Sequence, residues 1–399
     1  MPRMSRRAFL AALSRAGVGA AALAALPPWT RRALAAAADK DQLTPAAVDF
    51  IIRNDRPENW ETPIDAFGQW ITPNHRFFVR NHLSTPSIDG AAWRLEVTGL
   101  VRTPLAMSLA DLKALPQTTA VHTLECAGNG RGLMNLPSTS GTQWQRGAVG
   151  TAEWEGVRLS TLLQRAGVAP EAQHVWFEAS DQAPMPAVPK FLRSIPIAKA
   201  KDDVLLAHSM NGEPLPELHG FPLRAIVPGW FGMAWTKWVA AVRVEDRPSD
   251  NHFMVRGYRY NYPHLGPLPP MPVEAIRIKS LITRPLDGAK LVLLPRLKGK
   301  PPLLRIQGFA WAGPSGVRLV EISTDGGKTW QPAGFMGDTA PGAWRAWATE
   351  IEVAPPARVS VMARATDNAG EVQPLEAQAN PGGYGNNSIQ KVTVNVRLA

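Results

Sequence analysis

The chain has a single cysteine, Cys126, among 399 residues. A lone thiol forms no intramolecular disulfide and builds no multi-cysteine zinc site, so the sequence excludes both. Three uses of the thiol remain: an inert buried side chain, a nucleophile, or one soft ligand to a metal ion.

The residues that follow Cys126 favour the metal ligand. Ala127, Gly128 and Gly130 carry little or no side chain, so a bulky group can approach the sulfur closely. Arg131 adds a permanent cation, which favours the thiolate over the thiol. On these residues alone, a structural buried cysteine stays the alternative.

The chain also lacks an apolar run of the roughly 20 residues that a membrane span requires. The apolar stretch at residues 16–26 is rich in Ala and Gly and follows the twin arginines Arg6 and Arg7. Small residues at 33–38 offer an A-x-A-type cleavage site. This pattern predicts a Tat signal peptide over residues 1–38, and hence a periplasmic protein that is exported folded and has no stable membrane span. A basic N-terminal tail or a weak anchor is the alternative.

A concentrated basic surface is missing as well, although the formal net charge is +10. Six of the 43 basic residues are arginines within residues 1–38, which contain no acid; the remainder has 37 basic residues against 33 acidic ones. Because nucleic-acid binding requires a clustered basic face, the sequence gives no support for a nucleic-acid partner.

The length after the predicted signal, about 360 residues, favours two domains. The proline-rich stretch from Tyr262 to Pro272 is the best linker candidate. We therefore predict a first domain at residues 39–260, a linker at 261–272 and a second domain at 273–399.

The second domain has the pattern of an all-β fold. Short runs with apolar alternation occur at residues 303–310, 317–323, 344–353, 359–365 and 391–397. Turn sequences at 324–330 and 366–370 separate some of these runs. Regular short strands predict an immunoglobulin-like β-sandwich, and the missing cysteine pair excludes an antibody-like domain.

The first domain mixes both kinds of element. Residues 108–115 and 159–166 have apolar faces at helical spacing, each with a serine placed to cap or start the first turn. Residues 93–97 and 223–227 are typical of strands. The fold class that follows is α+β, with long loops available for function.

Polar clusters in the first domain carry candidate chemistry. Arg80 and His82 lie two residues apart and share a face if their segment is extended; the alternative is an ordinary edge strand. Tyr258 lies between two arginines in the segment 256–260; the alternative is a buried aromatic side chain.

His219, Arg224 and Lys237 form a further cluster, three potential cations set among glycines and prolines. Such a group suits a phosphate or pyrophosphate through charge-assisted hydrogen bonds. A basic surface patch is the alternative.

The order of these motifs resembles the sulfite oxidase family of molybdenum enzymes, from about residue 60 to the end of the chain. The segments that carry the resemblance are Phe78-Val-Arg-Asn-His82, Leu124-Glu-Cys-Ala-Gly-Asn129, Met210-Asn-Gly-Glu-Pro-Leu215, His219-Gly-Phe-Pro-Leu-Arg224, Lys237-Trp238 and Asp325-Gly-Gly-Lys-Thr-Trp330. Together with the predicted Tat signal, the chain is most similar to the bacterial periplasmic branch, which includes sulfite dehydrogenases and the sulfane dehydrogenase subunit SoxC.

The resemblance implies a mixed α+β molybdopterin domain followed by an Ig-like dimerisation domain. It also implies a molybdenum–molybdopterin cofactor (Moco), with Cys126 as the thiolate ligand of the metal. Positions that match cofactor-binding residues of the family are Phe78, Val79, Arg80, Asn81, His82, Asp181, His219, Arg224, Trp235, Thr236 and Lys237. Arg80 and Tyr258 match residues on the substrate side, and Arg131 and Trp144 would complete an anion pocket.

The implied activity is oxidation of a sulfur oxyanion, sulfite or carrier-bound sulfane sulfur, by oxo transfer, with electrons passing to a c-type cytochrome. The expected assembly is a homodimer or a hetero-oligomer with a cytochrome subunit. We expect no haem in this chain, because residues 39–60 are too few for a haem domain.

The C-terminal neighbourhood Asn380-Pro-Gly-Gly-Tyr-Gly-Asn-Asn387 lacks the arginine that family members often supply there, so a larger, carrier-bound or sulfoxide substrate is an alternative to free sulfite. A sulfoxide reductase, a metal-free exported thiol enzyme and a cofactor-free binding protein are the competing functions.

Overall fold

The computed structural model describes residues 50–399, apart from 135, 137–138, 186 and 297–298. The predicted signal peptide and residues 39–49 lie outside the described residues. Residues Phe50–Ala399 form one compact unit. In this part of the chain, we find no helix with the length and apolarity of a membrane span.

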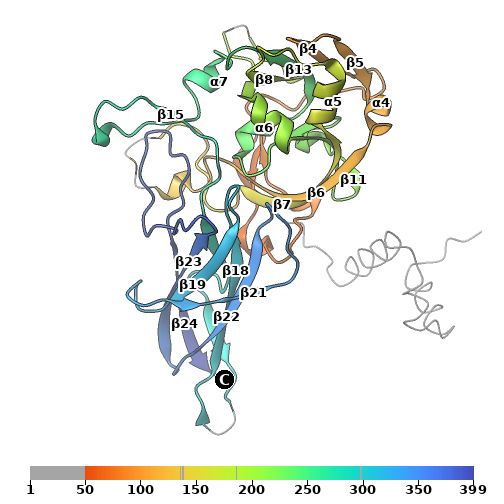
Figure 1. Ribbon diagram of the computed structural model, residues 1–399. Helices are drawn as coiled ribbons and strands as arrows, with labels where there is room; N and C mark the ends of the chain where they lie inside the picture. The colour runs from red at the N-terminus through yellow and green to blue at the C-terminus, as the bar shows by residue number, and fades with distance from the viewer. Residues whose placement is uncertain (1–49, 135, 137–138, 186, 297–298) are drawn as a thin grey trace, which may run out of the picture. The chain divides into compact units, whose positions relative to one another are not determined.

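The first domain contains two five-stranded sheets (Figure 1). One has the order β11-β10-β7-β6, with β12 also paired to β10. Its strands are β6 (Gln117–Glu125), β7 (Val149–Arg158), β10 (Leu205–Met210), β11 (Glu213–Pro214) and β12 (Arg224–Ile226). All six residues of β10 are buried, as expected for a central strand covered on both faces.

The other sheet has the order β5-β4-β13-β8-β9, in which only β4 and β13 run parallel among its pairs. Its strands are β4 (Arg94–Gly99), β5 (Leu105–Ser108), β8 (His174–Ala179), β9 (Leu192–Pro196) and β13 (Val239–Glu245). Strand β8 alternates buried and partly buried residues, so one of its faces packs on the core.

Short helices accompany these sheets: α4 (Leu109–Lys113), α5 (Leu159–Ala166), α6 (Ile197–Asp202) and α7 (His252–Val255). Ser108 caps α4 in a capping box with Asp111, as the sequence predicts. Ser160 does not cap α5, because the helix begins after Arg158, but it lies in the first turn of this helix, which is the other position that the sequence allowed.

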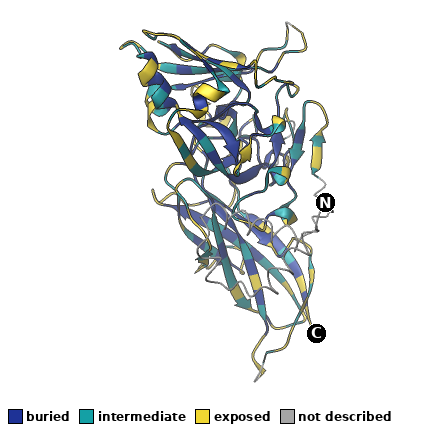
Figure 2. Ribbon diagram, turned by 90° about the vertical axis from the view of Figure 1, so that its right-hand side faces the viewer, coloured by how far each residue is buried: buried dark blue, intermediate teal, exposed yellow. Residues whose placement is uncertain are grey.

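The second domain is a sandwich of two sheets whose orders are β16-β18-β22-β21 and β17-β24-β23-β19-β20. Its strands are β16 (Lys279–Arg284), β17 (Lys290–Leu293), β18 (Leu303–Trp311), β19 (Val317–Ser323), β20 (Gln331–Pro332), β21 (Gly334–Met336), β22 (Arg345–Glu352), β23 (Ala357–Asp367) and β24 (Gln390–Leu398). Figure 2 shows buried and exposed residues alternating along several of these strands. The fold class is therefore the expected one, an α+β domain followed by an Ig-like β-sandwich.

Smaller sheets flank the two domains. Strands β1 (Ile51–Asn54), β2 (Asn59–Glu61) and β3 (Val79–Arg80) form one of them. Strands β14 (Arg259–Tyr260) and β15 (Met271–Pro272) form another, so the proline-rich segment between them folds back as a hairpin.

A buried polar cluster joins the sandwich to the end of β6. Lys279 Nζ lies 2.5 Å from Glu125 Oε1, and Trp311 Nε1 donates to Glu125 Oε2 at 2.9 Å. Glu125 is 1% exposed. Since Glu125 directly precedes Cys126, the second domain helps to fix the backbone at the thiol.

Candidate active site

Cys126 begins a tight loop directly after β6, here called the cysteine loop (residues 126–131). Its amide donates to Ala148 O at 2.9 Å, and its carbonyl accepts from Asn129 N at 2.9 Å. Burial raises the pKa of the thiol, and the positive charges of Arg80 and Arg131 offset only part of this effect. Arg131 thus lowers the pKa of the thiol, as the sequence predicts, but burial has the larger effect. A bound cation would be needed to hold the sulfur as a thiolate.

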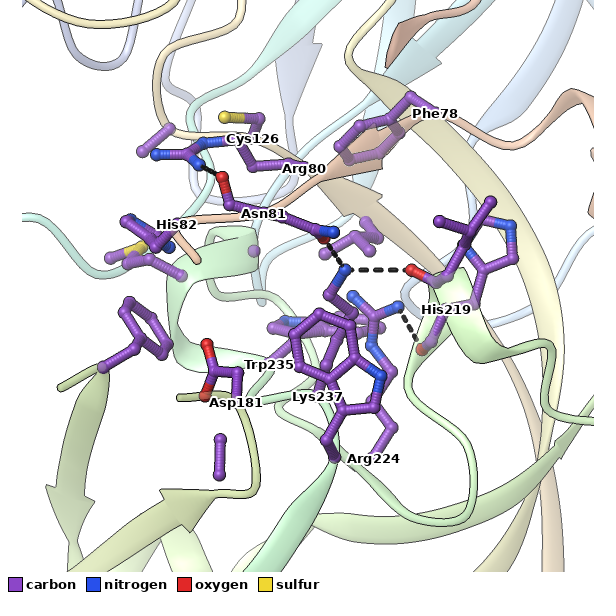
Figure 3. Close-up of a pocket in the computed structure, with 18 of the residues that line it drawn as sticks. Phe78, Arg80, Asn81, His82, Cys126, Asp181, His219, Arg224, Trp235 and Lys237 are labelled. Atoms are coloured by element: carbon purple, nitrogen blue, oxygen red, sulfur yellow. Dashed lines mark hydrogen bonds between the residues drawn. The ribbon is translucent and has the colours of Figure 1, made fainter. Parts of the chain in front are cut away.

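The sulfur faces a pocket with about 670 Å³ of space free of protein atoms, part of it open to solvent. Figure 3 shows Cys126 and Arg80 at one end and His219, Arg224 and Lys237 at another. The lining residues come from segments far apart in the sequence: Phe78, Arg80, Asn81, His82, Leu124, Cys126, Ala127, Ala179, Asp181, Phe191, Leu218, His219, Arg224, Gly232, Met233, Trp235, Lys237, Trp238 and Tyr258.

Arg80 is the last residue of β3 and His82 lies two residues further on, and both line the pocket. The Arg80 guanidinium contacts Asn59 Oδ1 at 3.3 Å and the carbonyl of Asn81. These contacts come from neutral acceptors, so the charge of Arg80 remains available to an anion.

Arg224 and Lys237 place two cations deep in the protein. Arg224 Nη1 donates to His219 O at 2.9 Å, while its Nε has no partner among the described residues. Lys237 Nζ donates to Leu218 O at 2.9 Å and to Asn81 Oδ1. Burial lowers the pKa of Arg224 to about 9, and burial followed by the charge of Arg224 lowers the pKa of Lys237 well below its usual value.

His219 belongs to the same cluster but does not carry the positive charge expected of it. Burial, with Arg224 and Lys237 nearby, lowers its pKa to about 3, so the ring is neutral at neutral pH. Its Nε2 lies 3.1 Å from Asn74 O, which makes this nitrogen the hydrogen-bond donor.

Asp181 is an acidic residue of the pocket lining, and its charge interacts with that of Lys237. It is 2% exposed, and its Oδ1 has no hydrogen-bond partner among the described residues. Burial raises its pKa to about 6, against the lowering effect of Lys237. Within the described part of the chain, neither Arg224 nor Lys237 has a carboxylate within ion-pair distance.

Buried cations without a paired anion are costly unless a ligand supplies the charge. The unpartnered Nε of Arg224 and the ammonium group of Lys237 are therefore suited to bind the phosphate of a cofactor. At the other end, the close-packed cysteine loop leaves the soft sulfur of Cys126 open to a metal. The residues present thus fit a phosphorylated metal cofactor.

Tyr258 also lines the pocket, with its hydroxyl 2.5 Å from His82 Nε2. The sequence interpretation that two neighbouring arginines flank this hydroxyl is wrong: Arg256 is exposed, and Arg259 contacts Met254 O and Pro270 O. The arginine that faces the Tyr258 ring is Arg193 of β9, whose Cζ lies 5.4 Å from the ring centroid.

Four predicted site residues do not line the pocket. Trp144 is fully buried and packs edge-on against Phe78, and Val79 and Thr236 are buried beside lining residues. Arg131 is buried with Nε on Gly382 O (3.0 Å) and Nη1 on Thr142 O (2.9 Å). Trp144 thus supports the pocket wall at Phe78, whereas Arg131 ties the end of the cysteine loop to Thr142 and Gly382.

Phe191, Arg193, Met233 and Trp238 are residues of the site that sequence reasoning missed. Phe191 stacks on the His82 ring with 4.2 Å between centroids, and Lys237 Nζ lies 4.2 Å from the Trp238 ring. The Lys237-Trp238 pair in the sequence could have indicated Trp238, but no local pattern distinguishes the other three.

Comparisons with known proteins agree with this geometry. Residues 82–253 match the oxidoreductase molybdopterin binding domain, and residues 271–397 match the Mo-co oxidoreductase dimerisation domain. Mitochondrial sulfite oxidase of Mus musculus is 37% identical over 81% of this chain and 61% of its own length. Sulfite oxidase of Gallus gallus is 34% identical over 81% of this chain and 72% of its own length.

The crystal structure of the sulfane dehydrogenase SoxCD from Paracoccus pantotrophus contains a similar chain. The TM-score is 0.75 and the identity is 31%, with 91% of this chain and 92% of that chain covered. The chain spans about three fifths of the length of the mouse sulfite oxidase. With two matching domains and relatives above 30% identity over most of their length, the chain belongs to the sulfite oxidase family of molybdopterin oxidoreductases.

Proposed function

We propose that this protein is a periplasmic molybdenum oxidoreductase that oxidises a sulfur oxyanion, or sulfane sulfur held on a carrier, and passes the electrons to a c-type cytochrome. The observation that carries the proposal is the arrangement of one pocket, with the lone thiol and Arg80 at one end and two buried unpaired cations at the other. The sulfite oxidases and the sulfane dehydrogenase described above act, by name, on sulfite or sulfane sulfur.

In this proposal the cofactor is held at both ends. Cys126 is the protein ligand of molybdenum, and Arg224 and Lys237 bind the phosphate of the pterin. The neutral rings of His219 and His82, with Asn81 and Asp181, line the space between these ends. When bound, the cofactor supplies oxygen-atom transfer and two-electron redox chemistry.

The protein's own residues bind and orient the substrate. Arg80 attracts a small sulfur oxyanion and holds it near Cys126 through charge-assisted hydrogen bonds. The Tyr258 hydroxyl, bound to the neutral His82 ring, presents its oxygen to the same space. In the net reaction the sulfur gains one oxygen from water and releases two electrons and two protons.

Molybdenum content and substrate choice test the proposal. Protein produced in a host that makes the cofactor should contain about one molybdenum per chain, measured by elemental analysis. Steady-state assays with sulfite, thiosulfate and carrier-bound sulfur, using cytochrome c as acceptor, should show oxidation. A sulfoxide reduced by a chemically reduced dye would instead support a sulfoxide reductase.

The matched variant is Cys126→Ser, because serine is similar in size but offers a hard oxygen ligand. We expect it to fold and to lose turnover. Full turnover in this variant, or a purified enzyme that is active without molybdenum, would exclude the proposal and favour a metal-free thiol enzyme.

Export is tested separately. Replacing Arg6 and Arg7 by lysine keeps the charge but removes the pair that the Tat receptor reads, so precursor should accumulate in the cytoplasm. Normal export of this variant would exclude the Tat signal. We also propose a homodimer or a hetero-oligomer with a cytochrome subunit, which light scattering of the purified enzyme would distinguish.

A further inference from the structure

A loop of the second domain, residues 380–387, packs directly on the cysteine loop; it is called here the C-terminal loop. Gly385 N donates to Ala127 O at 2.8 Å, and Asn386 Nδ2 donates to Gly130 O at 2.8 Å. Asn386 is buried with 5% exposure. The loop therefore fixes the backbone next to the thiol from outside the first domain.

The C-terminal loop holds its own shape through one side chain. Asn380 Nδ2 donates to Tyr384 O at 2.8 Å, and Tyr384 N donates to Asn380 Oδ1 at 3.1 Å. Gly383 has φ +58°, and a Cβ atom there would lie 2.7 Å from Arg131 Cγ. A side chain at this position would thus push the loop away from Arg131.

This conformation places the Tyr384 ring beside Arg131 of the cysteine loop and beside Tyr258 of the pocket. The guanidinium carbon of Arg131 lies 5.1 Å from the Tyr384 ring centroid, and the Tyr258 ring is 5.2 Å away at an interplanar angle of 31°. The Tyr384 hydroxyl also accepts a long hydrogen bond, 3.4 Å, from Tyr258 N.

Tyr258 needs such support because its backbone has φ +54°, a conformation that residues other than glycine rarely adopt. Its ring contacts the Tyr384 ring and also the Arg193 guanidinium, whose Cζ lies 5.4 Å from the ring centroid. Its hydroxyl ends at His82 in the pocket. The direction of this side chain therefore depends on the second domain through Tyr384.

We propose that Tyr384 is a positioning residue, which acts through Tyr258 and fixes the Tyr258 hydroxyl relative to Cys126. The role in turnover rests on the proposed function. Because Tyr384 belongs to the C-terminal loop, the second domain takes part in shaping the substrate side of the site, beyond any role in dimerisation.

The experiment compares the molybdenum-loaded wild-type enzyme with Tyr384→Leu and with Tyr262→Leu as the matched control. Tyr262 is a buried ring of the aromatic cluster against which the partly buried Tyr384 packs, and its hydroxyl contacts Arg277. We expect Tyr384→Leu to lower kcat about tenfold, since small displacements of reacting groups are costly, with a smaller change in KM. Tyr262→Leu should change kcat less than twofold.

A double-mutant cycle separates positioning from a general structural effect. If Tyr384 acts through the Tyr258 hydroxyl, Tyr384→Leu should change kcat less than twofold when Tyr258→Phe is already present. Full additivity of the two losses would overturn the proposal, and so would a single variant Tyr384→Leu with wild-type kcat.

Amide hydrogen exchange gives a readout that does not depend on turnover. Tyr384→Phe keeps the ring but removes the hydroxyl, so exchange should accelerate at Tyr258 and stay unchanged across the cysteine loop. This conservative variant keeps the test decisive if Tyr384→Leu does not fold. Unchanged exchange at Tyr258 in the variant would overturn the proposed contact. If Tyr384→Phe accelerates exchange at Tyr258 but the wild-type enzyme does not oxidise sulfur compounds, only the proposed function is overturned.

Discussion

Inside the pocket, Nε2 of His82 and the hydroxyl oxygen of Tyr258 lie 2.5 Å apart. Burial, followed by the charges of Arg80, Arg193 and Lys237, lowers the pKa of His82 well below its usual value. Burial raises the pKa of Tyr258 to about 12. At neutral pH the ring is therefore the acceptor and the phenol is the donor, so this contact keeps the hydroxyl oriented without carrying a charge.

The first prediction concerns this pair. Tyr258→Phe removes one hydrogen bond to a neutral acceptor, so kcat/KM should fall by roughly three- to tenfold, which corresponds to about 0.5–1.5 kcal/mol. Because the pKa of Tyr258 lies near 12, the pH profiles of wild type and variant should have the same shape below pH 10. An ionisation below pH 10 that disappears in Tyr258→Phe would contradict the assignment of the phenol as a protonated donor.

The second prediction tests the buried cations. Lys237→Met keeps much of the side-chain length but removes a charge that would contact the cofactor phosphate. Losing one charge-assisted hydrogen bond of about 1.5–3 kcal/mol should weaken cofactor binding by roughly ten- to a hundredfold. Molybdenum per chain after dialysis should fall, and the increase in Tm on cofactor loading should shrink.

The control for this variant is Lys201→Met, which removes the same kind of charge from an exposed position in α6. Its cofactor content and its Tm increase should match those of the wild type. Equal cofactor retention in Lys237→Met and Lys201→Met would mean that the buried lysine has another partner.

Local sequence patterns predicted the five long strands β18, β19, β22, β23 and β24 of the sandwich, because these strands carry their own apolar alternation, but they missed β16, β17, β20 and β21. The expected runs at 317–323 and 391–397 coincide with or lie within β19 and β24. The α+β class of the first domain followed in the same way from helical and extended periodicities. Such information is local, so neighbouring residues suffice to recover it.

Contacts between distant segments were not predictable in this way. Arg193 faces the Tyr258 ring although 65 positions separate the two residues, and Tyr384 reaches the same ring from the other domain. The neighbouring arginines that the sequence favoured point elsewhere because the chain turns at Tyr258, whose φ is +54°. The charge states of buried groups could not be predicted from the sequence either, because the low pKa of His219 results mainly from burial, which depends on the fold.

The third prediction addresses the contact between the domains. Lys279→Met leaves Glu125, which is 1% exposed, without its cationic partner 2.5 Å away. Removing one member of a buried ion pair should lower the free energy of unfolding by about 3–5 kcal/mol. Adding Glu125→Gln should restore part of this loss, because the stranded charge is then gone.

Urea unfolding monitored by tryptophan fluorescence measures these differences. The matched control is Arg364→Met, which breaks a partly exposed pair with Glu321 in the sandwich. Its cost should be only about 0.2–1 kcal/mol. If Lys279→Met costs no more than Arg364→Met, the buried cluster does not hold the domains together.

The last prediction concerns acid stability and His122, which lies in β6 beside the second-domain residue Gly342. Thr123 N donates to Gly342 O at 2.9 Å, and a Cβ atom at Gly342 would lie 2.5 Å from His122 Nδ1. Burial, followed by the charge of Lys199, lowers the pKa of His122 to about 4. In the unfolded chain a histidine has a pKa of about 6.5.

Between these two values the unfolded state binds a proton at His122 that the folded state does not, so stability falls as the pH falls from about 6.5 to about 4. Because the ring is not fully enclosed, we expect this group to contribute about 1–2 kcal/mol, below the full linkage value of about 3 kcal/mol. His122→Gln removes the titration, so its unfolding free energy should decline less than that of the wild type over this pH range. His264→Gln, at an exposed ring, is the control and should follow the wild type. Parallel pH curves for wild type and His122→Gln would show that another group causes the acid sensitivity of this contact.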